Sequence, residues 1–178
     1  MGTQKSYVLG GGCFWCLDSS YMQFEGVIDV EVGYMGGPGA NPTYEEVCNG
    51  NTMHAEVARV IFDTEVIPAD VILDIFFTLH DPTQLNRQGA DVGTQYRSSM
   101  FYADDAEKAE FEAAIERAKA HWDGVFATTL EPMTNFWMGE TYHQDFFAKN
   151  PFQGYCTAVV APKMAKVRAA FTKYLKKA

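Results

Sequence analysis

The chain has little cysteine, little positive charge and no long apolar run. Four cysteines in 178 residues are too few for a disulfide scaffold, which small secreted domains need at high density. Fourteen basic against twenty-three acidic side chains give a net charge of −9, which opposes binding to a phosphate backbone. No stretch reaches the roughly eighteen apolar residues of a membrane span, and no signal-type apolar run follows Met1. We therefore expect a cytoplasmic protein that binds neither nucleic acid nor membrane.

Patterns for metals and phosphates are also missing. The four histidines show no spacing such as H-E-x-x-H. Cys13 and Cys16 form a C-x-x-C pair, but a zinc site needs a second pair of ligands, and only Cys48 with His54 comes near that pattern. The glycines at 10–12 continue into neither G-x-G-x-x-G nor Gly-Lys-Ser/Thr. We expect no metal and no organic cofactor.

The size and composition of the chain favour one domain. A chain of 178 residues, 47% hydrophobic and 14% aromatic, is long enough to bury a full core. We find no internal repeat and no low-complexity linker. We expect a single domain over residues 1–178, with a core at about 6–156 and a C-terminal helical tail at about 157–178.

Hydrophobic periodicity predicts the order of the elements. Residues 28–34 alternate between apolar and polar, as in a half-buried strand. Thr43 and Glu46 form a capping-box pattern that opens a short helix, closed near Gly50. Strand, helix, strand, then strand, helix, strand is the split βαβ order, so we predict an α+β fold with a ferredoxin-like core, a mixed sheet, extra helices and long loops. The predicted strands are 6–10, 28–34, 54–62, 97–102 and 126–130; the longer predicted helices are 13–24, 70–80, 104–120, 140–148 and 163–177; and 81–96 is a loop without a clear period.

The pentapeptide Gly12-Cys13-Phe14-Trp15-Cys16 lies between a predicted strand and a predicted helix. We expect Cys13 to be exposed at the helix N-terminus, where the helix dipole and free N–H groups favour the thiolate, which is the nucleophilic form. The two aromatic rings beside it indicate a binding pocket. Two other interpretations remain open: inert burial of both thiols, and a thioredoxin-like dithiol, although small residues or Pro usually separate the cysteines there.

Glu56 is the candidate acid. It shares one face of its predicted strand with Ala58, Val60 and Phe62, whereas Arg59 marks the opposite face as the wetter one. A carboxyl group among apolar side chains has a raised pKa, because burial disfavours its charged form. Glu56 would then stay protonated near neutral pH and donate a proton. The alternative is a structural carboxylate that accepts backbone N–H bonds, or a strand end in water.

Five segments of the chain, taken together, match one enzyme family in sequence order. They are Gly12-Cys13-Phe14-Trp15, Tyr44-x-x-Val47-Cys48-x-Gly50-x-Thr52-x-His54-Ala55-Glu56, Asp81-Pro82-Thr83, Asn86-x-Gln88-Gly89-x-Asp91-x-Gly93-x-Gln95-Tyr96-Arg97-Ser98, and Glu140-x-Tyr142-His143-Gln144. From about residue 7 to 156 the chain resembles peptide methionine sulfoxide reductase of the A class. Cys16 stands where the family commonly has Gly, and Met53 stands where Gly often precedes the His-Ala-Glu run.

The resemblance implies a chemistry centred on Cys13. The thiolate would attack the sulfur of the S-epimer of methionine sulfoxide, free or in proteins, with Glu56, Tyr44 and Tyr96 around the sulfoxide oxygen. Complete ionisation of a thiol gains at most about thirty-fold in rate, roughly 2 kcal/mol, whereas one oxyanion-type donor contributes roughly 3–4 kcal/mol. The groups around the oxygen should therefore matter more than activation of the thiol. The products would be methionine and a Cys13 sulfenic acid.

The resemblance also implies binding residues and partners. Phe14 and Trp15 would hold the S-methyl group, and Asp91 would help to position the substrate. A second thiol would convert the sulfenic acid into a disulfide, which thioredoxin would reduce. We expect a monomer whose partners are methionine sulfoxide or an oxidised protein, and thioredoxin. Two rival functions are a non-catalytic methionine-binding module with the same aromatic pocket and a general dithiol–disulfide oxidoreductase through Cys13 and Cys16.

Three cysteines are candidates for the resolving thiol. Cys48 lies on the apolar side of its short helix, and we interpret it as a buried packing residue. Cys16 is one helical turn from Cys13, but a disulfide within one turn needs a helix-start geometry to avoid strain. Cys156 follows residues 150–155, a Gly/Pro loop able to move, which resembles the family's Asn-Pro-x-Gly-Tyr-Cys recycling segment with one extra residue. We favour Cys156, with Cys16 as the alternative.

Overall fold

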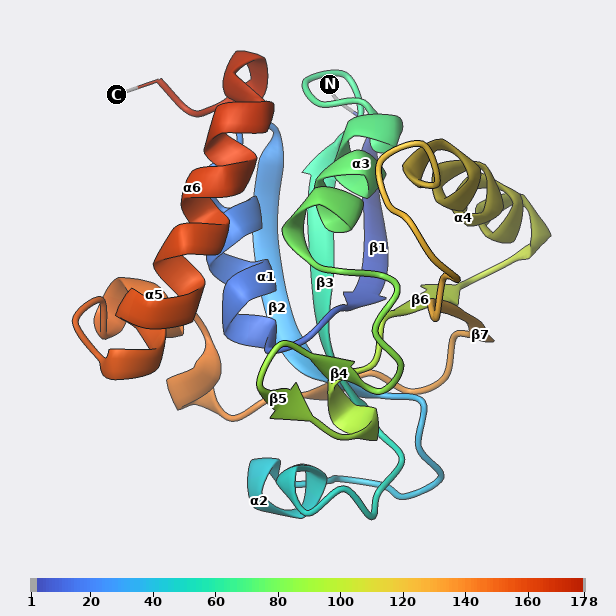
Figure 1. Ribbon diagram of the computed structural model, residues 1–178, viewed down its shortest axis with the longest axis vertical. Coiled ribbons are helices and arrows are strands. Elements are labelled where there is room, and N and C mark those ends of the chain that lie inside the picture. Colours follow the sequence, from blue (N-terminus) through green and yellow to red (C-terminus); the bar gives the residue numbers. More distant parts are fainter. Residues whose placement is uncertain (1–2, 178) are drawn as a thin grey trace.

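The computed structural model describes residues 3–177, which form one six-stranded sheet, a small two-stranded hairpin and a set of helices (Figure 1). The strands are β1 (Gln4–Gly10), β2 (Val27–Met35), β3 (Ala55–Asp63), β4 (Arg87–Gln88), β5 (Asp91–Val92), β6 (Ser99–Tyr102), β7 (Thr129–Pro132) and β8 (Trp137–Met138). The α-helices are α1 (Phe14–Tyr21), α2 (Tyr44–Cys48), α3 (Ala69–Leu79), α4 (Asp105–Ala118), α5 (Phe146–Lys149) and α6 (Ala161–Ala170). Short 3₁₀ turns are η1 (Thr94–Tyr96), η2 (Thr141–His143) and η4 (Thr172–Tyr174), and η3 (Cys156–Val160) is a π-helical turn.

The predicted ferredoxin-like core is confirmed by the strand order. The sheet runs β7-β6-β1-β3-β2-β8. Its four central strands are antiparallel, with β1 between β6 and β3, while β7 runs parallel to β6. The sheet is therefore mixed, as predicted, and β1-α1-β2 and β3-α3-β6 form the two interleaved crossovers.

Helices α1, α3, α4 and α6 cover one face of the sheet. Leu17 from α1, Phe76 from α3, Phe111 from α4 and Val167 from α6 all belong to one buried apolar cluster with the inward side chains of the strands. Burial of apolar area at roughly 25 cal/mol per Å² is the main force that holds such a layer on a sheet. Within residues 3–177 no helix is both long enough and apolar enough to cross a membrane.

Local sequence signals place two helix starts correctly. The Thr43 side chain accepts a hydrogen bond from the Glu46 N–H at 3.2 Å, and the Glu46 carboxylate accepts one from the Thr43 N–H at 3.1 Å, so the predicted capping box is present. Asp104 caps α4 in the same way through the Glu107 N–H at 2.8 Å. A cap of this kind contributes about 1 kcal/mol.

The C-terminal helix is shorter than periodicity predicts. It ends at Ala170, where the chain turns so that Phe171, Tyr174 and Leu175 pack on the main core. Leu175 also bridges to Phe24 beyond the end of α1. These tertiary contacts override the local helical pattern.

Other predicted boundaries are also corrected. The first helix ends at Tyr21 rather than 24, and the helix predicted at 140–148 is divided between η2 and α5. The strand predicted at 126–130 begins at Thr129. The segment 81–96 contains β4, β5 and η1, so this long stretch is a folded hairpin and turn.

Candidate active site

Cys13 is the N-cap residue of α1, at the end of the sheet where α2 and the β4–β5 hairpin gather (Figure 1). The glycine before it is required by geometry. Gly12 has φ +82°, and a Cβ there would lie 2.9 Å from Cγ of Gln88. The Gly12 N–H donates to the carbonyl of Tyr96 at 3.2 Å, which joins the start of α1 to η1.

The prediction that Cys13 is exposed and ionised is wrong. Its side chain sits at the helix start as expected, but Cys13 is only 7% exposed. Burial, and next the nearby Glu56 carboxyl and the Cys16 thiol, hold the pKa of Cys13 well above its usual value. The resting Cys13 side chain is a neutral thiol, because packing of the helix start against apolar side chains removes the water that would stabilise a thiolate.

Glu56 lies on the helix-covered face of β3, as its strand pattern predicts. It is 1% exposed, and its Oε1 accepts a hydrogen bond from the Phe14 N–H at 3.2 Å. Oε2 is buried and has no hydrogen-bond partner among residues 3–177. Burial raises the pKa of Glu56 to about 8, while the Phe14 N–H lowers it and Asp91 raises it. Glu56 is therefore mostly protonated at neutral pH, with one oxygen free for another partner.

An aromatic wall stands beside Cys13. Phe14 is fully buried, with its ring stacked on Tyr44 at 6.2 Å between centroids and tilted against Tyr34 at 5.6 Å. Trp15 stacks on Phe146 at 3.7 Å. Glu140 supports this wall, because its carboxylate accepts from the Tyr34 hydroxyl and from the Tyr44 N–H, each at 2.8 Å..

Tyr44 and Tyr96 keep their phenolic protons. Burial first, and then the Glu56 carboxyl, raise the pKa of both hydroxyls. Both hydroxyls lie near the Cys48 thiol, whose pKa burial raises and the two hydroxyls lower. Cys48 is exposed, so its predicted burial is wrong. The five-residue helix α2 buries only Val47, which leaves the next side chain facing outward.

Asp91 is joined to a residue that sequence reasoning missed. The Tyr155 hydroxyl donates to Oδ2 of Asp91 at 2.5 Å, and the Tyr155 ring meets the edge of Trp15 at 5.8 Å. Burial is the main cause that raises the pKa of Tyr155, followed by the nearby Cys13 and Cys16 side chains and by Asp91. Its hydroxyl thus lies close to both thiols. The only signal in the sequence is its place directly before Cys156.

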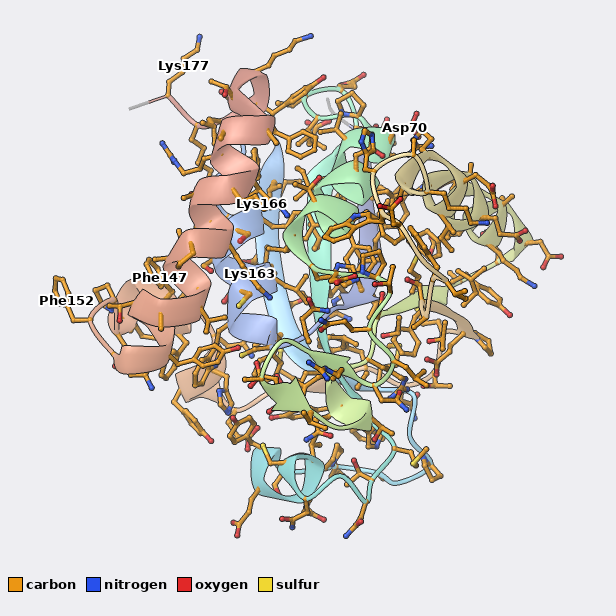
Figure 2. The ribbon with its side chains drawn as sticks, viewed as in Figure 1. Asp70, Phe147, Phe152, Lys163, Lys166 and Lys177 are labelled. Carbon is orange, nitrogen blue, oxygen red and sulfur yellow. The ribbon has the colours of Figure 1, made fainter. Side chains whose placement is uncertain are left out.

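The other two candidate thiols are buried in the same apolar cluster as Cys13. Cys16 donates its N–H to the Cys13 carbonyl at 3.1 Å, and burial raises the pKa of its thiol to about 11, against the opposing effect of Lys163. Figure 2 shows Lys163, which sequence reasoning also missed, extending from α6 toward α1. Cys156 begins η3, which is continuous with α6. The predicted loop before it is present at 150–153, whereas Gly154 and Tyr155 are already helical.

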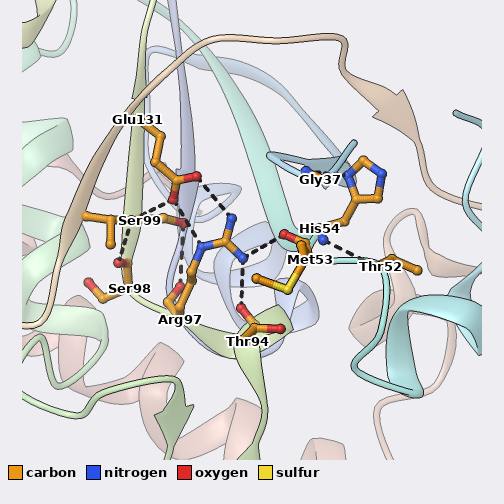
Figure 3. A network of polar contacts seen from close by, with 10 residues as sticks. Gly37, Thr52, Met53, His54, Thr94, Arg97, Ser98, Ser99 and Glu131 are labelled. Atoms are coloured by element: carbon orange, nitrogen blue, oxygen red, sulfur yellow. Dashed lines mark hydrogen bonds and ion pairs between the residues drawn. The ribbon is translucent and has the colours of Figure 1, made fainter. Parts of the chain in front are cut away.

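Arg97 joins the segments that carry Glu56 and Tyr96 (Figure 3). Its Nη1 donates to the carbonyls of Met53 at 3.1 Å and Thr94 at 3.0 Å. Its Nε and Nη2 donate to the Glu131 carboxylate at 3.0 and 3.1 Å, a bidentate ion pair. This one guanidinium fixes the start of β3 and the turn η1 relative to β7.

Cys48 and His54, considered above as a second pair of zinc ligands, make other contacts. His54 lies with Nε2 2.7 Å from the Gly39 carbonyl, and its Nδ1 accepts from the Gly37 N–H at 3.1 Å. Cys48 interacts with the two tyrosines. Across residues 3–177 no three His, Cys, Asp or Glu side chains converge as a metal site.

Sequence comparison identifies the family. Residues 5–175 match the model of the family described as Peptide methionine sulfoxide reductase. The chain belongs to this family. The family and enzyme class expected from the motifs are thereby confirmed.

Individual members of the family are similar over nearly the whole chain. Peptide methionine sulfoxide reductase MsrA of Clavibacter michiganensis is 60% identical over 174 residues, which cover 98% of this chain and 99% of that protein. Mxr1 of Saccharomyces cerevisiae in its reduced form superimposes with a TM-score of 0.81 at 37% identity, over 86% of this chain and 89% of Mxr1. Mxr1 in complex with Trx2 matches with a TM-score of 0.57 at 27% identity, over 80% of this chain and 84% of that one.

Proposed function

We propose that this chain reduces the S-epimer of methionine sulfoxide, free or in proteins, to methionine through Cys13. Membership of the peptide methionine sulfoxide reductase family supports the reaction class. The observation that carries the residue assignments is the buried, unpartnered Oε2 of Glu56 beside the helix start that bears Cys13. A buried polar atom without a partner costs free energy, so it is best explained by a ligand that satisfies it.

Glu56 supplies the proton that the sulfoxide oxygen needs. With a pKa of about 8, the carboxyl group is protonated at neutral pH. The Cys13 sulfur forms a bond to the substrate sulfur, the S–O electron pair moves toward oxygen, and Glu56 protonates that oxygen. The proton lost by the thiol restores Glu56, so the neutral resting thiol is compatible with the chemistry. Tyr44 and Tyr96, whose hydroxyls stay protonated, hydrogen-bond to the oxygen as charge develops there.

The oxygen then passes to Cys13. The substrate sulfur loses its bonds to the oxygen and to the Cys13 sulfur, and a bond forms between that oxygen and the Cys13 sulfur. Methionine leaves, and Cys13 carries the hydroxyl as a sulfenic acid. One thiol and one sulfoxide thus give one sulfenic acid and one sulfide, with no other reductant in this step.

The aromatic side chains on one side of the site and the polar groups on the other give the proposed selectivity for one epimer. Phe14 and Trp15 hold the S-methyl group, while Glu56 and the two tyrosines hold the oxygen. A sulfoxide sulfur carries a methyl group, an oxygen, a chain and a lone pair, so fixing the first two relative to the attacking thiol selects one handedness. Asp91, held by Tyr155 near Cys13, orients the remainder of the substrate.

We further propose Cys156 as the resolving thiol, with Cys16 as the alternative. Either sulfur attacks the sulfenic sulfur, and water leaves as the disulfide forms. Packing of all three cysteines in one apolar cluster supports both choices. For Cys156 the π-helical turn would have to open, and π-helical turns are rare segments that often mark functional sites. A dithiol protein such as thioredoxin then reduces the disulfide and is itself oxidised, which the Mxr1–Trx2 complex supports.

The test is an assay of the separate sulfoxide epimers with dithiothreitol as reductant. We expect stoichiometric methionine from the S-epimer and none from the R-epimer. Insulin disulfide reduction in parallel serves as the control for a general dithiol oxidoreductase. If neither epimer is consumed, the proposed function is wrong and a methionine-binding module becomes the better explanation. If insulin is reduced rapidly and sulfoxide is not, the protein is a general dithiol–disulfide oxidoreductase.

A further inference from the structure

His143 lies at the centre of the aromatic wall, although the proposed chemistry does not use it. It ends the turn η2 and is fully buried. Its ring centroid is 5.0 Å from that of Phe14, 4.3 Å from that of Tyr44 and 4.0 Å from that of Tyr142. A titratable side chain buried this deeply beside the helix start calls for a physical account.

The Trp15 indole decides which nitrogen of His143 carries the hydrogen. Nε1 of Trp15 lies 2.9 Å from Nδ1 of His143, and an indole N–H can only donate. Nδ1 must therefore present its lone pair, which places the hydrogen of the neutral ring on Nε2. Burial lowers the pKa of His143 and so favours the neutral ring. Nε2 has no hydrogen-bond partner within residues 3–177, so none of these residues favours the other tautomer.

Three contacts hold Trp15: two with aromatic rings and one hydrogen bond to His143. Of these three, the hydrogen bond fixes the position of the indole within its own plane. Its ring stacks on Phe146 at 3.7 Å with 4° between the planes, and Tyr155 meets it edge-on at 5.8 Å. Such ring contacts resist tilting but tolerate sliding, because offset stacking has a broad range of geometries. The bond to His143 is directional and removes that freedom.

The acceptor is itself fixed. The His143 N–H donates to the Glu140 carbonyl at 2.9 Å, and the Glu140 carboxylate is tied to the Tyr34 hydroxyl on β2 and the Tyr44 N–H on α2. The turn η2 is thus bound to the sheet and to α2. Nδ1 of His143 is a fixed point from which the position of Trp15 can be set.

We propose that His143 is a positioning residue that sets the size of the S-methyl pocket by holding Trp15 through Nδ1. This inference rests on the proposed function, in which Trp15 forms a wall of that pocket. Loss of the acceptor lets the indole slide and widens the pocket. A widened pocket discriminates less between a methyl and a larger group on the substrate sulfur.

The experiment compares kcat/KM for the S-sulfoxides of methionine and of ethionine, which differ by one methylene on sulfur, with dithiothreitol as reductant. His143→Leu removes the acceptor at similar volume, whereas His143→Asn places an amide oxygen close to the position of Nδ1. His121→Leu, at an exposed position outside the site, is the matched control. We expect H143L to lower the methionine preference about fivefold, the effect of one lost hydrogen bond, while H143N and H121L stay within about twofold of the parent chain. An unchanged preference in folded H143L, or an equal fall in H143N, overturns the proposal.

A second measurement needs no variant to fold. In ¹⁵N spectra of the parent chain, His143 should carry its hydrogen on Nε2, and a hydrogen on Nδ1 overturns the inference. Failure of the parent chain to turn over either sulfoxide overturns the proposed function. Normal turnover by the parent chain, together with an unchanged preference for methionine sulfoxide over ethionine sulfoxide in H143L, overturns the role of His143 but not the proposed function.

Discussion

The Phe14 N–H and the Glu56 carboxyl form a hydrogen bond of 3.2 Å that joins the first residue of α1 to β3. Because Phe14 directly follows Cys13, this bond sets the distance between the proposed nucleophile and the proposed acid. It also occupies only one carboxyl oxygen, which leaves the other for the substrate.

Cys13→Ser should abolish sulfoxide reduction and leave the fold intact. A serine hydroxyl fills nearly the same volume, but it ionises far less readily than a thiol and is a much weaker nucleophile toward sulfur. Turnover of the S-epimer with dithiothreitol measures the loss, and circular dichroism with thermal unfolding checks the fold. More than a few per cent of the parent rate would exclude Cys13 as the nucleophile.

Glu56→Gln should lower the single-turnover rate by about a hundredfold, the typical effect of losing one preorganised donor. The amide keeps the bond from the Phe14 N–H but has no acidic proton to give. Glu116→Gln on the exposed side of α4, where Glu116 pairs with Lys119, is the matched control and should change the rate little. A rate within about threefold of the parent chain would make Glu56 structural.

The single-turnover rate should fall as the pH rises through about 8. The pKa of Glu56 is about 8 because the group is buried, so the proton it donates is present below that pH and lost above it. Glu56→Gln has no such proton, and its slower rate should not show this decline. A parent profile that stays flat between pH 7 and 9.5 would contradict the assignment of Glu56 as the acid.

Peptide mass spectrometry should identify the resolving thiol. Reduced protein is mixed with excess methionine sulfoxide and no reductant, then digested without exposure to thiols. We expect a Cys13–Cys156 bridge and loss of thioredoxin-dependent turnover in Cys156→Ser. A dominant Cys13–Cys16 bridge, or full turnover by C156S, would transfer the role to Cys16.

Substitutions at Met53 should change the free energy of unfolding through the backbone conformation that each residue allows, and not through side-chain contacts. Met53 has φ +63° and is 52% exposed, and Arg97 holds its carbonyl in place. Met53→Gly should preserve or raise the free energy of unfolding, whereas Met53→Val should lower it by about 1–2 kcal/mol, because a β-branched residue tolerates this region poorly. Urea unfolding of both variants makes the comparison, and a G variant less stable than the V variant would contradict it.

The backbone conformation at Met53 also bears on the departure from the family pattern at this position. Glycine often precedes the His-Ala-Glu run in the family, and the left-handed backbone at Met53 gives the physical reason. The pattern at Glu56 was equally informative, because strand alternation alone placed the carboxyl group on the buried face. The capping residues Thr43 and Asp104 located two helix starts for the same reason: each signal acts over three or four residues of chain.

By itself the sequence determined the order of the elements, the ferredoxin-like core, the family and the residues at the start of α1. These follow from local periodicity and short motifs. Tertiary structure alone decided that Cys13 is a neutral, buried thiol, that Cys48 faces outward and that Cys156 lies in a helix. It also brought Tyr155 to Asp91 and His143 to Trp15, pairs that lie 64 and 128 residues apart. Burial and pKa depend on which distant segments pack together, and no pattern within one segment carries that information.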